Sequence, residues 1–140
     1  MYKIIQSAHS GWAYVVLLAL VVAIINSLIG YISKREFSTN DKRMALFGLI
    51  ATHVQIVIGI ILYFVSPLGL NSFGDMGNAQ LRLTALEHPI TNVIAITLIT
   101  IGWSKHKKAL TGNSKFKTIL IFYAIGLLML LSRIPWSNWM

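Results

Sequence analysis

Four long apolar runs, separated by short polar segments, make up most of this chain of 140 residues. The runs cover about residues 5–31, 44–66, 85–103 and 117–132. Each is close to the ~20 residues that an α-helix needs to cross the hydrocarbon core of a bilayer. None shows the strict polar and apolar alternation of a membrane barrel strand. The pattern therefore predicts an all-α fold, an integral membrane four-helix bundle.

Short connections between the runs favour an up-down-up-down order of antiparallel neighbours. The composition agrees with this prediction, because 56% of the residues are hydrophobic and 11% are charged, against roughly 25% charged residues in ordinary soluble domains. We expect a single transmembrane domain over residues 1–140. The first run is too long for the core of a signal peptide, so we expect it to be retained as a span.

The basic residues are unevenly distributed along the chain. Nine of the twelve lysines and arginines lie in the segments between the first and second runs or between the third and fourth, counting Lys117 at the border of the fourth run. The positive-inside rule places these two loops in the cytoplasm and both termini outside. The net charge of +8 does not form a basic stripe interleaved with exposed aromatic residues, so we expect the lipid bilayer, and no nucleic acid, as a partner.

Several classes of chemistry lack the residues they need. The chain has no cysteine, which excludes disulfides, thiolate metal sites, covalently attached c-type haem and cysteine-ligated iron–sulfur clusters. No Walker A loop, dinucleotide fingerprint, H-E-x-x-H or G-x-S-x-G motif occurs. Hydrolysis and phosphoryl transfer therefore have no support, and whether the protein is an enzyme stays open.

Three histidines, His9, His53 and His88, lie in or at the edge of the apolar runs. Ionisable residues are costly there, so a functional role is the first expectation. At 1.5 Å per residue, His9 and His88 lie near the same outer end, while His53 lies roughly 10 Å deeper. Histidines at matching depth on different helices can supply both axial ligands of a b-type haem, and helix bundles commonly hold cofactors in this way. His9 and His88 are therefore the predicted iron ligands, and His53 would support the pocket or replace one of them.

Three further polar residues are candidates for contact with such a cofactor. Asn92 lies one turn after His88 on the same helical face, where it can bond a cofactor edge or a neighbouring helix. Arg82 and Arg133 lie near the outer end and can pair with haem propionates through charge-assisted hydrogen bonds. Alternatively, the two arginines anchor span ends at the lipid headgroups.

Two polar positions have simpler interpretations. Thr84 and Glu87 have the T-x-x-E spacing of a capping box, which predicts the start of a helix. His106 lies in a lysine-rich segment and is expected to be solvated.

Two alternatives remain for the three membrane histidines. Polar side chains in spans often form hydrogen bonds between helices. A copper or zinc site built from all three histidines is also open, although the unequal depth of His53 argues against it.

Several short motifs follow one another along the chain. They are His-Ser-Gly-Trp at 9–12, Asp-Lys-Arg at 41–43, His-Val-Gln at 53–55, Leu-Glu-His-Pro at 86–89 and Arg-Ile-Pro-Trp at 133–136. Together they resemble the small bacterial four-span membrane proteins labelled cytochrome b-like. The resemblance implies a multi-pass haem b protein of the bacterial cytoplasmic (inner) membrane, and carries over His9, His53 and His88 without specifying which pair binds iron.

The leading hypothesis is a haem b-binding membrane protein that transfers single electrons and is linked to a quinol pool or a redox protein. The alternative is a haem-free accessory subunit of a larger membrane complex, whose polar residues join helices. Association into a homo-oligomer is compatible with both hypotheses.

Overall fold

The computed structural model describes residues 1–136, which are organised around four long helical segments. The elements in chain order are α1 (Tyr2–Ser33), α2 (Thr39–Val65), the 3-10 helix η1 (Leu70–Asp75), α3 (Ala79–Arg82), the π-helical turn η2 (Leu83–Glu87), α4 (His88–Lys108) and α5 (Gly112–Ser132). Within these 136 residues there is no β-strand, which confirms the all-α prediction for the described part of the chain.

The four long segments are Tyr2–Ser33, Thr39–Val65, Ala79–Lys108 and Gly112–Ser132, and each is long and apolar enough to cross a membrane. Large apolar side chains such as Ile4, Leu18 and Phe64 are exposed on the outside of the molecule. An outer surface of this kind is expected of helices that face lipid, because lipid tails are as apolar as the side chains. The fold is therefore compatible with a multi-pass membrane protein.

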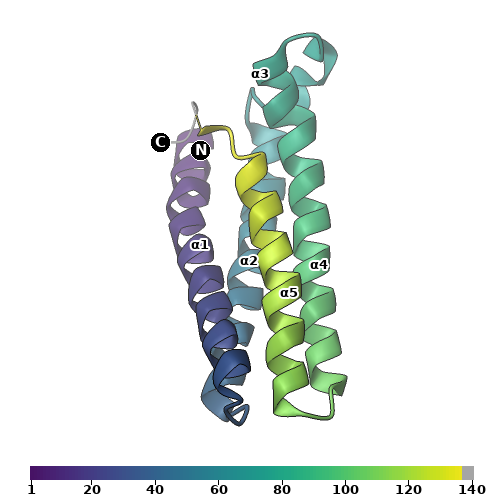
Figure 1. Ribbon diagram of the computed structural model, residues 1–140. Helices are drawn as coiled ribbons and strands as arrows, with labels where there is room; N and C mark the ends of the chain where they lie inside the picture. The colour runs from purple at the N-terminus through teal and green to yellow at the C-terminus, as the bar shows by residue number, and fades with distance from the viewer. Residues whose placement is uncertain (137–140) are drawn as a thin grey trace.

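The long helices lie side by side in one bundle (Figure 1). The helix α5 packs against both α1 and α4, and α1 also packs extensively against α2. The contact between α2 and α4 is less extensive than these three. The two short helices, η1 and α3, lie at the end of the bundle where α1 begins (Figure 1).

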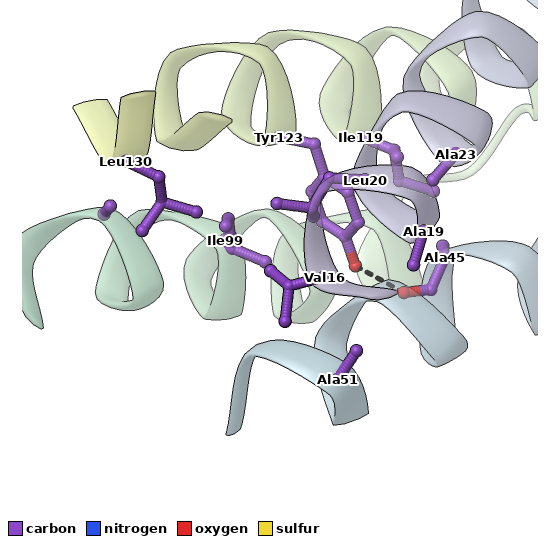
Figure 2. Packing of buried hydrophobic residues seen from close by; sticks show 11 residues of the cluster. Val16, Ala19, Leu20, Ala23, Ala45, Ala51, Ile99, Ile119, Tyr123 and Leu130 are labelled. Carbon is purple, nitrogen blue, oxygen red and sulfur yellow. Dashed lines mark hydrogen bonds between the residues drawn. The ribbon is translucent and has the colours of Figure 1, made fainter. Parts of the chain in front are cut away.

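Tyr123 of α5 is at the centre of the buried apolar cluster. Its side chain is fully buried, and its hydroxyl donates a hydrogen bond to the carbonyl of Ala45 at 2.8 Å (Figure 2). A Cβ added at Gly48, in the next turn of α2, would lie 3.5 Å from both Leu20 and Tyr123. Small residues therefore let α1, α2 and α5 approach closely, as in membrane helix bundles generally.

The turn between α1 and α2 is held by caps at both ends. Lys34 has a left-handed backbone, with φ 55°, and Arg35 N–H bonds the Gly30 carbonyl in the pattern of a Schellman motif. The α2 helix starts with a capping box between Ser38 and Asp41.

The carboxylate of Asp41 also connects the capping box to α1. It accepts hydrogen bonds from Asn26 at 2.8 Å and from Arg35 at 2.6 Å. Asp41 is buried whereas Arg35 is exposed. The cap and the ion pair together fix the angle at which α2 follows α1.

The prediction that His106 is solvated is wrong, because α4 continues to Lys108 and turns this residue inward. The His106 side chain is 1% exposed, with its ring centre 5.5 Å from that of Phe37 and 4.5 Å from that of Trp103. Its Nδ1–H donates to the Trp103 carbonyl at 2.6 Å. Phe37 and Trp103 shield the His106 ring from solvent, although its neighbours in the sequence are lysines.

We expect Asp41→Ala to lower the free energy of unfolding by about 1–3 kcal/mol, because the change removes a helix cap and the buried carboxylate that accepts hydrogen bonds from Asn26 and Arg35. The measurement is a denaturant titration of the purified protein in mixed micelles. Asp75→Ala is the matched control, because Asp75 is exposed in η1. Equal stability losses in the two variants would contradict a structural role for the Asp41 network.

Candidate functional site

A cavity of about 480 Å³ lies between the long helices at the end of the bundle where α1 begins. Its volume is in the range of sites that bind small molecules and cofactors. All four long helical segments contribute to the lining, which includes His9 of α1, Gln55 of α2, His88 of α4 and Leu130 of α5. Most of the lining is apolar, so the few polar groups determine what the cavity can bind.

His9 and His88 meet inside this cavity. Their ring centres are 6.2 Å apart, and the ring planes are at 88° to each other. One histidine comes from α1 and the other from the start of α4, so the pair joins segments 79 positions apart in the sequence. The structure therefore brings together the two histidines that the sequence predicts to lie at equal depth.

The ring of His88 is held by a main-chain carbonyl. Its Nδ1 lies 2.9 Å from the carbonyl oxygen of Arg133, just after α5. A carbonyl can only accept, so Nδ1 carries the proton and Nε2 is the unprotonated nitrogen. Metal-binding histidines are commonly oriented by this kind of hydrogen bond. The side-chain amide of Asn92 donates to Nε2 at 3.1 Å, so Asn92 is on the cavity side of His88, as its spacing predicts.

His9 is positioned by contacts between α1 and α2. The Gln55 side chain donates to the His9 carbonyl at 2.7 Å, and the Trp12 indole donates to the Ala51 carbonyl at 2.9 Å. The ring occupies the space beside Gly59, where an added Cβ would lie 3.2 Å from His9 Cε1. A glycine at this position therefore makes room for the imidazole.

Three buried polar atoms in this region have no hydrogen-bond partner among the described residues. They are His9 Nδ1, Gln55 Oε1 and Asn92 Oδ1. Buried polar atoms are nearly always hydrogen-bonded in native proteins. All three residues line the cavity, so the cavity has unused hydrogen-bonding capacity.

The capping box predicted at Thr84 and Glu87 does not form. The helix begins earlier, at Ala79, where the Asn78 side chain accepts from the backbone N–H groups of Gln80 and Leu81. Thr84 instead donates back to the Leu81 carbonyl at 3.2 Å. The apolar run begins after the true helix start, which explains the wrong prediction.

Glu87 pairs with Arg82 at 3.2 Å, and Arg82 also donates to the Met76 carbonyl. The Arg82 side chain is thus engaged outside the cavity lining. Arg133 is exposed, and its guanidinium donates to the Ser132 carbonyl. Its contribution to the site is the main-chain carbonyl that holds His88, a role that the sequence does not reveal.

His53 is not part of this cavity. It is exposed on α2, where its Nδ1 donates to the Leu49 carbonyl at 2.8 Å and its Nε2 lies 3.4 Å from the Thr100 hydroxyl. Within residues 1–136, no group of three or more histidine, aspartate or glutamate side chains could hold a metal ion. A copper or zinc site built from all three histidines is therefore not formed.

Comparisons with models of known protein families, with curated proteins and with solved structures give no match to this chain. The chemistry of the cavity is therefore the basis for assigning a function.

We expect Gly59→Val to displace the His9 ring and separate it from His88, because even the first added carbon is in tight contact with the imidazole. The measurement is NMR of the histidine-labelled protein in micelles, in which the cross-peak between the two rings should disappear. Gly11→Val is the control, because a Cβ at Gly11 has no atom within 4 Å. A cross-peak that persists in Gly59→Val would contradict this packing.

Proposed function

We propose that the protein is a haem b-binding electron-transfer protein of the bacterial cytoplasmic membrane, in which His9 and His88 would hold the haem iron. The observation that carries the proposal is the separation of the two ring centres, 6.2 Å, across an apolar cavity. At this separation both imidazoles would be able to hold one metal ion through a ring nitrogen.

The other residues of the cavity are compatible with this cofactor. The hydrogen bond from His88 to the Arg133 carbonyl leaves Nε2 unprotonated, and this nitrogen would hold the metal in place of the hydrogen bond that it accepts from Asn92. For His9, the buried and unpaired Nδ1 is consistent with a ring whose environment is completed by a bound group. The apolar lining excludes water and suits the macrocycle.

When bound, haem supplies a centre that accepts and releases one electron. The protein's part is to hold the two imidazoles and keep water out of the cavity. Arg133 is a cation at this end of the bundle that would be available to pair with the haem propionates. Arg82, in contrast, already pairs with Glu87.

A lipid-soluble donor, such as a quinol, is a suitable partner. Ile60 and Phe64 of α2 and Val93 of α4 line the cavity and are also exposed on the outer surface. The cavity therefore reaches the outer surface between α2 and α4, whose contact is less extensive than those of α1 with α2, α1 with α5 and α4 with α5. A redox protein at the outer membrane surface is the other class of partner.

In the membrane, we propose an up-down-up-down bundle with the cavity near the outer face. Nine of the twelve basic residues lie in or beside the segments that join α1 to α2 and α4 to α5, which supports a cytoplasmic location for both. The N-terminus would then be outside. The same is proposed for the C-terminus, although residues 137–140 lie outside the described part of the chain.

The test of haem binding is a reduced-minus-oxidised absorption spectrum of detergent-purified protein expressed with added haem. We expect sharp α and Soret bands of b-type haem in the wild type, and their loss in both His9→Ala and His88→Ala. His53→Ala is the control and should retain them, because His53 does not line the cavity.

A wild-type spectrum without these bands would refute haem binding. Co-purification with a large membrane complex would then favour the alternative of a haem-free accessory subunit.

The orientation can be tested by labelling single cysteines, because the natural chain has none. Gly74→Cys should react with a membrane-impermeant maleimide in intact spheroplasts, and Leu110→Cys only after the membrane is opened. Both positions are exposed, so unequal reactivity would reflect the side of the membrane. The opposite labelling pattern would mean that the orientation is inverted.

A further inference from the structure

The helix that carries His88 is irregular directly before this residue. Leu83–Glu87 forms a π-helical turn, and the His88 N–H bonds the carbonyl of Leu83, five residues back. A regular α-helix would use the carbonyl of Thr84, four residues back. The turn therefore contains one extra residue, which rotates the following residues about the helix axis and sets the direction in which His88 points.

Pro89 adds a second irregularity at the next position. It has no N–H, so it cannot donate to the carbonyl four residues earlier, that of Ala85, as a residue of a regular α-helix would. Ala85 is 2% exposed, and a buried carbonyl without a partner is costly. The hydroxyl of Tyr63 fills this place, because it donates to the Ala85 carbonyl at 2.8 Å.

Tyr63 is itself firmly placed. It lies in the last turns of α2 and lines the cavity. The buried Gly69 packs directly on its backbone, where an added Cβ would overlap the Tyr63 carbonyl. The tyrosine is therefore a fixed donor from α2 to the irregular turn.

We propose that Tyr63 is the positioning residue of His88. By donating to the Ala85 carbonyl, to which Pro89 cannot donate, its hydroxyl stabilises the π-turn and keeps the His88 imidazole directed into the cavity. It acts across helices, whereas the Arg133 carbonyl acts on the ring directly. The link between Tyr63 and Pro89 stands independently of the cofactor, and its consequence for haem binding rests on the proposed function.

The first test is Tyr63→Phe, which removes the hydroxyl and keeps the ring. NMR of the histidine-labelled, cofactor-free protein should show the His88 ring signals shifted or doubled, with the His9 signals less affected. In the haem-loaded protein, affinity should fall roughly ten-fold, the lower end of the effect of partners that orient a metal-binding histidine. Tyr31→Phe is the matched control, because Tyr31 is near the far end of α1 and does not line the cavity.

The second test repeats the change in a Pro89→Ala background. Alanine restores an N–H that can bond the Ala85 carbonyl, so the hydroxyl of Tyr63 becomes dispensable there. We expect Tyr63→Phe to leave the His88 signals of Pro89→Ala nearly unchanged. If Tyr63→Phe alone does not fold, recovery of folding in the double variant would give the same support.

Equal effects of Tyr63→Phe in both backgrounds, or no effect on His88 in either, would overturn the proposal. A wild-type protein that binds no haem but shows the expected NMR coupling would refute the proposed function and leave the Tyr63–Pro89 link standing.

Discussion

The need to satisfy main-chain carbonyls in apolar surroundings governs how these helices fit together. Within residues 1–136, the side chains that donate to a carbonyl on a neighbouring helical segment include Lys115, which donates to the His106 carbonyl, and four others. These four donors are Trp12, Gln55, Tyr63 and Tyr123, and their acceptors are the carbonyls of Ala51, His9, Ala85 and Ala45. A carbonyl has two lone pairs, so it can accept such a bond while serving its own helix. Three of the four acceptors belong to alanines, whose small side chains leave the backbone accessible to the donor.

The same hydrogen bonds connect the fold to the cavity. The bond from Gln55 reaches the main chain of His9, the bond from Tyr63 reaches the turn before His88, and His88 itself donates to the Arg133 carbonyl. Tyr123 and Ala45 hold the rest of the bundle closely packed. A well-packed region thus supports an open cavity in which three buried polar atoms have no partner among the described residues. Such a division is expected of a scaffold that holds a binding site.

The features that could be predicted from the sequence depend on the periodicity of apolar residues and on depth within a span. The apolar runs correspond to four long helical segments, and the equal depth of His9 and His88 anticipated their contact in the cavity. Prediction from the sequence failed where contacts between distant segments determine whether a residue is buried. His106 is buried because Phe37 and Trp103 cover it, although its sequence neighbours are lysines.

Features formed by main-chain geometry were also missed. The π-turn before His88 and the role of the Arg133 carbonyl depend on where α2 and α5 end relative to α4, which no local pattern encodes. The capping box of Ser38 and Asp41 was a local signal that could have been found. It was missed because the apolar run begins several residues later.

In each of these hydrogen bonds, the donor and the acceptor constrain the amino-acid sequence to different degrees. The donor must be a particular side chain, whereas any residue type supplies the acceptor, since every residue has a carbonyl. Evolution is therefore free to vary the accepting positions, within the limits of size, without losing a single bond. Related chains could preserve this whole network while sharing only a handful of donor residues, so divergence in sequence would be a poor guide to divergence in architecture.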